Sequence, residues 1–328
     1  MNPSPRNARR VLVLGGPTAS GKTAVALALS SHIRCQIIGA DARQIYRGID
    51  IGTAKPSPAE LSMVKHHCID KRDPKETYTA ADYSTDARAA IASVPINSLP
   101  ILVGGSGLYI AAALDGLSVG GIATDEQTRE RVQREFDERG RESMYAELES
   151  IDPRSAKLYE DRNPRRIQRA IEFYRMTGRP FSETFDTPRD AANVEAMYIG
   201  ITQDRAVLHA RIDARCEHMF ASGLVDETRR LLDEGVDRGA QSLRTVGYYE
   251  AISVIDGIRT EKEALDDLQK STRRYAKRQG TWFRKDKRYE WINGDVDTMV
   301  RRALAMLNAK GWLSDFVDLQ PIKSGKNV

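Results

Sequence analysis

Short apolar runs separated by helical patterns are the first regular feature of the chain. Three such runs lie at residues 11–14, 36–39 and 101–103, and each leads through polar or glycine-rich residues into a helical pattern. Two more apolar runs follow at 197–201 and 289–292. These runs predict five strands, and their alternation with helices is typical of an α/β fold with a parallel sheet. Ligands of such sheets bind beyond the carboxyl ends of the strands.

A phosphate-binding pattern follows the first predicted strand directly. Residues 16–23 have the spacing G-x-x-x-x-G-K-T of a P-loop, with a strand before it and a helical pattern after it. In this motif backbone N–H groups and the helix N-terminus surround phosphate oxygens. Lys22 adds a positive charge, and the Thr23 hydroxyl is suited to hold Mg²⁺. The predicted phosphate or pyrophosphate site comprises Gly16, Pro17, Thr18, Ala19, Ser20, Gly21, Lys22 and Thr23.

A charge-dense helical stretch interrupts the alternation of strands and helices in the middle of the chain. Within it Ile167 and Ile171 belong to an apolar stripe at helical spacing. We therefore predict a P-loop NTPase-like parallel sheet flanked by helices, built from residues 1–120 and 192–328, the latter including the C-terminal helices. A small all-helical domain is expected to be inserted at 121–191.

Acidic residues are placed unusually for a P-loop protein. Asp41 follows the second predicted strand, where a carboxylate can act as a general base toward the acceptor of a transferred group. It can equally cap a following helix, and its position alone does not decide between these roles. The third strand ends in glycines and Ser106, without the acid that usually holds Mg²⁺ and water in nucleotide hydrolases. This argues against routine ATP hydrolysis and favours transfer to a bound acceptor.

The overall composition excludes several classes of protein. The 328 residues are 41% hydrophobic and 29% charged, and no apolar run approaches the length of a membrane span. The three cysteines, Cys35, Cys68 and Cys216, are isolated, which argues against a disulfide framework and fits a reducing cytoplasm. His66 and His67 precede Cys68 but lack zinc-ligand spacing, so a loop or core role is favoured over metal binding.

The mild net charge of +4 is less informative than the distribution of the arginines. Arg211 and Arg215 stand four residues apart in a helical pattern, where they can either reach the phosphate site or form a solvated face. Residues 273–288 combine many basic side chains with Trp282 and Phe283. Basic residues interleaved with aromatic ones favour contact with RNA, although a charged helix followed by core aromatics has the same pattern.

Taken together, these stretches resemble the bacterial tRNA dimethylallyltransferases. The similarity extends from about residue 11 to about residue 283, and no Cys/His zinc-finger extension follows, as it would in the eukaryotic form. The stretch within 45–56 is the most specific, because generic P-loop proteins lack it. The segments that carry the resemblance are 16–23, 41–56, 102–109, 166–169, 244–248 and 272–284.

The resemblance implies an activity and a set of roles. The enzyme would transfer a dimethylallyl group from dimethylallyl diphosphate to N6 of adenosine 37 in the tRNA anticodon loop, and the P-loop would hold the diphosphate with Mg²⁺. Asp41 would be the general base, Ser106 would touch the leaving oxygen, and Arg215 would bind the diphosphate. The expected partners are the donor and the tRNA anticodon stem-loop, with no membrane, and the expected state is a cytoplasmic monomer. The resemblance assigns tRNA contacts to Asp41, Ala42, Arg43, Gln44, Arg129, Arg165, Arg166, Ile167, Gln168, Arg169, Arg244, Thr245, Val246, Gly247, Tyr248, Tyr249 and Arg278.

Three positions depart from the family pattern. Ala42 replaces a common serine, Ser106 a threonine, and Arg165 a frequent glutamine. Ser106 keeps the hydroxyl, whereas Arg165 could alter how the anticodon stem is held. The alternatives are a transferase that prenylates free adenine nucleotides, a small-molecule P-loop kinase and a non-catalytic RNA-binding protein. The intact Lys22 and Thr23 argue against the last.

Overall fold

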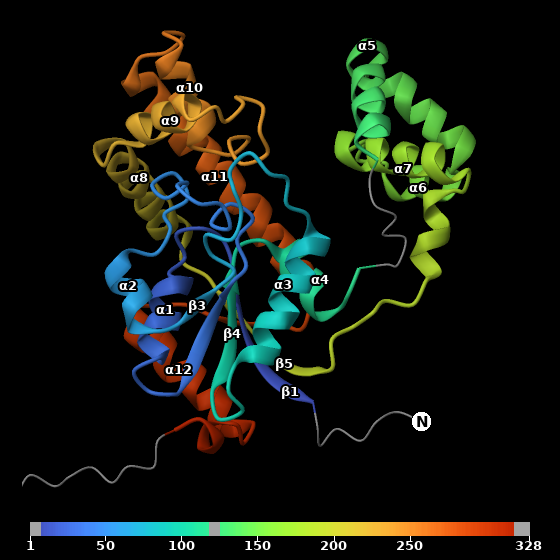
Figure 1. Cartoon of the computed structure of the whole chain (residues 1–328). Helices are drawn as coiled ribbons and strands as arrows, with labels where there is room; N and C mark the ends of the chain where they lie inside the picture. The colour runs from blue at the N-terminus through green and yellow to red at the C-terminus, as the bar shows by residue number, and fades with distance from the viewer. Residues whose placement is uncertain (1–7, 118–124, 318–328) are drawn as a thin grey trace, which may run out of the picture. The chain divides into compact units, whose positions relative to one another are not determined.

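A six-stranded parallel sheet forms the centre of the larger part of the molecule (Figure 1). The structure is a computed structural model that describes residues 8–117 and 125–317. The strands lie in the order β3-β2-β4-β1-β5-β6, and every pair of neighbours in this sheet is parallel. The strands are β1 (Arg9–Gly15), β2 (Cys35–Gly39), β3 (His66–His67), β4 (Leu99–Gly104), β5 (Val194–Ile201) and β6 (Glu290–Ile292).

Alternate side chains of the central strands enter two separate apolar cores. Leu12 and Leu14 of β1 belong to one core, and Val11 and Val13 belong to the other. All four are fully buried, as expected for a strand covered on both faces. The continuous apolar runs in the sequence therefore reflect burial on both faces of the sheet.

Helices cover both faces of the sheet. In one core, side chains of α1 and α12 and the Trp312 ring pack against the sheet. The other core is larger and includes side chains of α3, α4, α8, α9, α10 and α11. The helices of this unit are α1 (Lys22–Leu29), α2 (Pro58–Met63), α3 (Ala80–Ser93), α4 (Gly107–Leu114), α8 (Arg205–Ala221), α9 (Leu224–Asp233), α10 (Tyr248–Ile255), α11 (Glu261–Lys285) and α12 (Val296–Ala309), with a short 3-10 helix η3 (Leu313–Asp315).

The predicted α/β architecture is confirmed, and all five predicted strands are present. Four of them have slightly wider bounds than predicted, and β6 begins one residue later. The two-residue β3 at the sheet edge was not predicted. It consists only of His66 and His67, which form no apolar run in the sequence. The basic helix α11 extends from Glu261 to Lys285 and therefore includes Trp282 and Phe283. Phe283 is fully buried, so the core interpretation is correct for this aromatic residue, whereas Trp282 is 40% exposed.

A second compact unit lies between α4 and β5 in the chain and is assigned to Asp115–Ala192. The boundary predicted between residues 120 and 121 lies outside the described residues. The unit consists of helices with a core of its own, in which Val132 and Leu148 pack with Ile167 and Ile171. Its elements are α5 (Glu126–Ile151), α6 (Pro153–Leu158), α7 (Pro164–Thr177) and the 3-10 helix η2 (Phe181–Asp186).

The carboxyl ends of β2 and β4 approach each other so closely that one position excludes a side chain. A Cβ atom on Gly104 would lie 1.9 Å from the carbonyl oxygen of Ala40, which is backbone and cannot rotate away. Glycine is therefore needed at this end of β4. The contact places the glycines after β4 directly beside the segment that begins at Asp41.

We expect Gly104→Ala to lower the free energy of unfolding by about 2 kcal/mol or more, because the added methyl group forces the two strand ends apart. Urea unfolding followed by circular dichroism would measure the change. Gly280→Ala is the matched control, since Gly280 lies inside α11 and its Cβ would meet only the flexible Arg284 side chain, at 3.4 Å. The control should keep or slightly raise stability through helix propensity, and equal losses in both variants would contradict the argument.

Candidate active site

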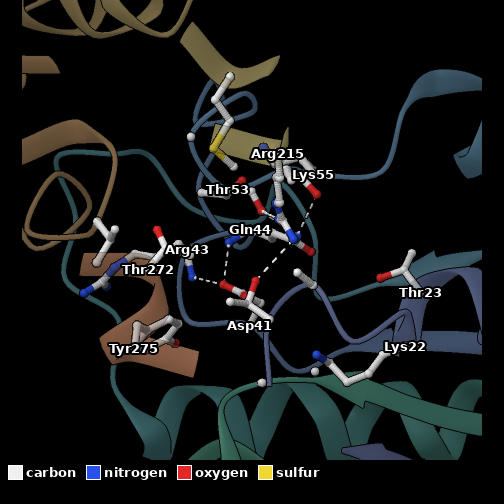
Figure 2. A pocket seen from close by; sticks show the side chains of 18 of the residues that line it. Lys22, Thr23, Asp41, Arg43, Gln44, Thr53, Lys55, Arg215, Thr272 and Tyr275 are labelled. Atoms are coloured by element: carbon white, nitrogen blue, oxygen red, sulfur yellow. Dashed lines mark hydrogen bonds between the residues drawn. The ribbon is translucent and has the colours of Figure 1, made fainter. Parts of the chain in front are cut away.

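A cavity of about 620 Å³ lies at the carboxyl end of the sheet, between the P-loop, the segment after β2 and helices α8 and α11 (Figure 2). Parallel strands place their carboxyl ends at one edge, so β1, β2 and β4 contribute neighbouring segments of its wall. Asp41, Lys22 and Arg215 all line this cavity. It therefore combines a carboxylate with two cations that are far apart in the sequence.

The P-loop has the backbone shape of an anion cradle. Gly16 has φ of +148°, and a Cβ atom there would lie 2.3 Å from the carbonyl oxygen of Ile201. The loop leads into α1, whose first residue is Lys22. The Lys22 ammonium group donates to the carbonyl oxygen of Pro17 at 2.6 Å, across the loop. Thr23 is exposed and also lines the cavity.

Burial alters the acidity of Lys22. Desolvation, together with the positive charge of Arg215, lowers the pKa of Lys22 to about 7, and the charge of Asp41 opposes this shift. The unfolded chain keeps the proton up to a much higher pH, so the free energy of unfolding should rise with pH above neutrality. The cradle thus holds a cation whose charge an incoming anion would stabilise.

Asp41 caps a turn as well as facing the cavity. Its Oδ1 atom accepts hydrogen bonds from the backbone N–H groups of Arg43 at 2.8 Å and Gln44 at 3.4 Å. Turns, rather than a helix, follow Asp41. The alternative prediction that Asp41 caps a helix is therefore wrong, since the residue caps a turn. Figure 2 shows Asp41, Arg215 and Lys22 around the same cavity. The negative charge of Asp41 favours the protonated forms of Lys22 and Arg215.

Arg215 spans the space between the P-loop and a second loop. Its Nη1 donates to the hydroxyl of Thr18 at 3.2 Å, and its Nη2 donates to the carbonyl oxygen of Thr53 at 3.2 Å. Burial lowers the pKa of the Arg215 guanidinium from its ordinary value. Arg211 also lines the cavity, near Gly21 of the P-loop. Two alternatives were predicted for Arg215, a side chain that reaches the phosphate site and one on a solvated helix face. The solvated face is excluded, because Arg215 lines the cavity and contacts the P-loop.

Two residues beside the cavity fix the backbone around it. Ser106 accepts a hydrogen bond from the backbone N–H of Ala42 at 3.2 Å, which ties the end of β4 to the segment after β2. Gln279 of α11 accepts from the N–H of Thr18 at 2.8 Å and donates to the carbonyl oxygen of Gly105 at 3.0 Å. Sequence reasoning missed Gln279, whose only signal was an uncharged amide inside a basic helix.

Several of the predicted tRNA contacts of the larger unit gather around the cavity. Arg43, Gln44, Thr245 and Val246 line it. Arg43 also donates to the carbonyl oxygen of Arg244 at 3.3 Å. The segments after β2 and before α10 are thereby joined at the rim.

Two predicted tRNA contacts need correction. The side chains of Ile167 and Tyr248 are both 0% exposed, because the first fills the core of the helical unit and the second packs in the larger core. Neither can touch RNA with its side chain. Gly247, beside Tyr248, is also buried, whereas Tyr249 is 66% exposed. Arg278 is exposed on α11, with its guanidinium over the Tyr275 ring.

The helical unit carries the other predicted tRNA contacts, and two of its arginines have acidic partners: Arg129 pairs with Glu126 and Arg166 with Asp161. Arg129, Arg165 and Arg166 are exposed, and Arg169 is partly buried. The Arg166 guanidinium lies over the Tyr159 ring, 5.7 Å from its centre. The remaining predicted residue, Gln168, donates to the amide oxygen of Gln133 at 3.0 Å. These contacts hold the cations on a rigid helical frame.

The two histidines form the edge strand β3 and are held by hydrogen bonds. His66 Nδ1 is bonded to the carbonyl oxygen of Val64 and His67 Nε2 to the side chain of Gln36, both at 2.8 Å. Across residues 8–117 and 125–317, no three His, Cys, Asp or Glu side chains come together as a metal cluster. No helix within this described part of the chain is long and apolar enough to cross a membrane.

Comparison with known proteins gives a consistent result. A family model described as IPP transferase matches residues 44–286. The tRNA dimethylallyltransferase of Geobacillus thermodenitrificans is 39% identical over 87% of this chain and 90% of its own length. That of a Nocardioides species is 40% identical over 94% and 99%, respectively. A solved tRNA isopentenylpyrophosphate transferase from Bacillus halodurans is 35% identical, with a TM-score of 0.68 and coverage of 94% of this chain and 97% of that one.

Lys22 should make anion binding pH-dependent near neutrality. The ammonium group attracts an anion only when protonated, and with a pKa of about 7 the free protein loses this proton just above neutrality. We expect the affinity for inorganic pyrophosphate, measured by isothermal titration calorimetry, to fall by up to about tenfold per pH unit above this pKa through Lys22 alone. Lys22→Met should bind more weakly at low pH and lack this component.

The ionisation of pyrophosphate itself affects both proteins equally, so the ratio of the two affinities is the quantity to follow. This ratio should be large below neutrality and should shrink as the solution becomes alkaline. A ratio that stays constant over this range would show that Lys22 does not titrate in the cavity.

Proposed function

The chain belongs to the IPP transferase family, and on this premise we propose that its cavity is the site of prenyl transfer to tRNA. The enzyme is a tRNA dimethylallyltransferase: it transfers a dimethylallyl group to N6 of adenosine 37 in the anticodon loop and releases diphosphate. The observation that carries the assignment of the site is the meeting of Asp41, Lys22 and Arg215 at one cavity. Asp41 is a base that can accept the proton of the amine, and Lys22 and Arg215 are cations that can neutralise the leaving diphosphate. The reaction requires both functions.

Dimethylallyl diphosphate is the donor that the cavity suits. Its diphosphate would occupy the P-loop, where backbone N–H groups, Lys22 and Arg215 neutralise the charge that develops on the leaving group. The same cavity has an apolar side formed in part by Met219, Val246 and Leu268. A short branched hydrocarbon can be buried there, away from water.

Asp41 is the base in this reaction. As the bond from C1 of the dimethylallyl group to the diphosphate oxygen breaks, a new bond forms between C1 and N6 of the adenine, and the N6 proton passes to the carboxylate. Both described hydrogen bonds of the Asp41 side chain end on Oδ1. Oδ2 can therefore receive the proton while Oδ1 keeps the carboxylate oriented. Positioning matters because an exocyclic amine is a weak nucleophile.

The cavity also suits a magnesium ion. Mg²⁺ is commonly held by few protein oxygens together with water and substrate phosphates, and the exposed Thr23 hydroxyl beside Lys22 supplies one such oxygen. When bound, the ion would neutralise part of the diphosphate charge. Thr23 would be its protein ligand.

The anticodon stem-loop would bind to two basic regions. In the larger unit Arg43, Gln44 and Thr245 line the cavity, and the flipped adenine would enter beside them. In the helical unit Arg129, Arg165 and Arg166 would contact phosphates, because they are exposed and a guanidinium suits phosphate oxygens. We expect the enzyme to act as a monomer.

A small-molecule kinase is the rival for a P-loop cavity. The described end of β4 carries glycines where nucleotide hydrolases usually hold an acid, and Gln279 fills the space above Gly105. A kinase would transfer phosphate from ATP to a small acceptor. Incubation of the protein with unmodified tRNA, Mg²⁺ and either labelled dimethylallyl diphosphate or labelled ATP separates the two, since only a prenyltransferase moves the first label into RNA.

Asp41→Asn should slow single-turnover prenyl transfer by about 10²–10⁴-fold, because the amide cannot accept the N6 proton. The measurement uses an unmodified anticodon stem-loop and labelled dimethylallyl diphosphate, both at saturating concentration. Binding of the stem-loop should stay within about twofold, since asparagine preserves the turn through its carbonyl oxygen. Pyrophosphate should bind as tightly as before or more tightly, because a negative charge beside Lys22 is removed. A near-normal rate would exclude Asp41 as the base.

Arg166→Ala should weaken tRNA binding and lower the slope of log affinity against log salt by about one, as expected for one lost phosphate contact. Filter binding with the full-length tRNA at several salt concentrations would measure it. Arg154→Ala is the matched control, because Arg154 lies in the same unit, is exposed and is paired with Asp186 over the Phe185 ring. Equal slopes for Arg166→Ala and the unaltered protein would rule out this contact.

A further inference from the structure

A buried carboxylate holds the loop that forms one wall of the cavity. Glu227 of α9 is only 8% exposed. Its two oxygens accept hydrogen bonds from the backbone N–H groups of Asp50, Ile51 and Gly52, at 3.2, 3.0 and 3.4 Å. The Tyr248 hydroxyl donates a further short hydrogen bond to the same carboxylate. One side chain therefore connects a loop, α9 and the start of α10.

The loop fixed in this way carries a carbonyl group that orients two residues of the site. The carbonyl oxygen of Thr53 accepts from Nη2 of Arg215 at 3.2 Å and from the amide of Gln44 at 3.1 Å. Thr53 directly follows the three residues whose N–H groups are bonded to Glu227. A shift of this loop would therefore move the hydrogen-bond acceptor on which the Arg215 guanidinium rests.

The packing leaves the loop little freedom while Glu227 is in place. A Cβ atom on Gly52 would lie 2.5 Å from the Tyr248 ring, so the loop backbone lies directly against that ring. Tyr248 in turn is fully buried and bonded to Glu227. The ring and the carboxylate together define one position of the loop.

We propose that Glu227 is a positioning residue for the reaction, which acts by holding the Thr53 carbonyl group where it orients Arg215 toward the diphosphate. The inference rests on the proposed role of Arg215. All four partners of Glu227 are donors, and an ionised carboxylate is a side chain that only accepts. A glutamine of the same shape would direct its NH₂ group at one or more of these donors and leave them unsatisfied.

The test is a double-mutant cycle read out by binding of inorganic pyrophosphate, with titration calorimetry on the full-length protein. Glu227→Gln should weaken binding by about 5–20-fold, as expected when a hydrogen-bonded orientation of a charged group is lost. Arg215→Ala should weaken binding by a similar or larger factor. In the Arg215→Ala background the second substitution should change affinity by less than about twofold, because the residue through which it acts is gone.

Thr228→Val is the matched control. Thr228 is the next residue of α9, is fully buried and bonds only within its own helix, to the carbonyl oxygen of Leu224. It should reproduce any general loss of stability in a thermal melt but leave pyrophosphate affinity within about twofold. If Glu227→Gln does not fold, Tyr248→Phe removes a single donor from the same carboxylate and should weaken pyrophosphate binding by about 2–5-fold.

Two results overturn the inference and are distinguishable. If Arg215→Ala loses affinity but Glu227→Gln, or Tyr248→Phe in its place, does not, Glu227 has no positioning role and the diphosphate role of Arg215 stands. Fully additive losses in the double variant have the same meaning. If Arg215→Ala binds pyrophosphate normally, the proposed role of Arg215 fails, and the inference fails with it.

Discussion

The balance of charge among Lys22, Asp41 and Arg215 is the constraint on which the rest of the site depends. Two cations and one carboxylate are held at a partly desolvated cavity, where unpaired charges are costly. Burial, followed by the positive charge of Arg215, lowers the pKa of Lys22 to about 7, whereas Asp41 favours the charged forms of both cations. The cavity is therefore short of negative charge, which a diphosphate supplies.

This charge arrangement also explains why the surrounding backbone is so firmly fixed. In the proposed function Arg215 binds the diphosphate, for which its guanidinium needs a defined direction. The Thr18 hydroxyl and the Thr53 carbonyl oxygen supply that direction. Gln279 and Ser106 then tie the P-loop and the two strand ends together through backbone groups. Preorganisation of this kind reduces the reorganisation needed when charge develops on the leaving group.

The fold and the location of the site could be predicted from sequence because their signals are local. Buried strands appear as apolar runs, and the P-loop is a contiguous motif whose backbone geometry depends on its own glycines. Gln279 and Glu227 could not be found in this way, since their partners lie about 260 and 175 residues away in the chain. The RNA contacts predicted for Ile167 and Tyr248 were wrong for the opposite reason. A resemblance assigns a whole segment to RNA, whereas the helix period already placed Ile167 on the buried stripe of α7.

The conflict at Ile167 shows how the two kinds of inference should be combined. A segment can face a ligand only through the side chains that its periodicity leaves outside the core, so the helical stripe limits which members of a motif can bind. Applied to 165–169, this rule leaves the exposed Arg165 and Arg166 available for the proposed RNA contacts and assigns Ile167 to packing. Applied to 244–249, it separates Thr245 and Val246, which line the cavity, from Tyr248, which braces Glu227. The same motif thus contains residues that line the cavity and residues that hold the surrounding backbone in place.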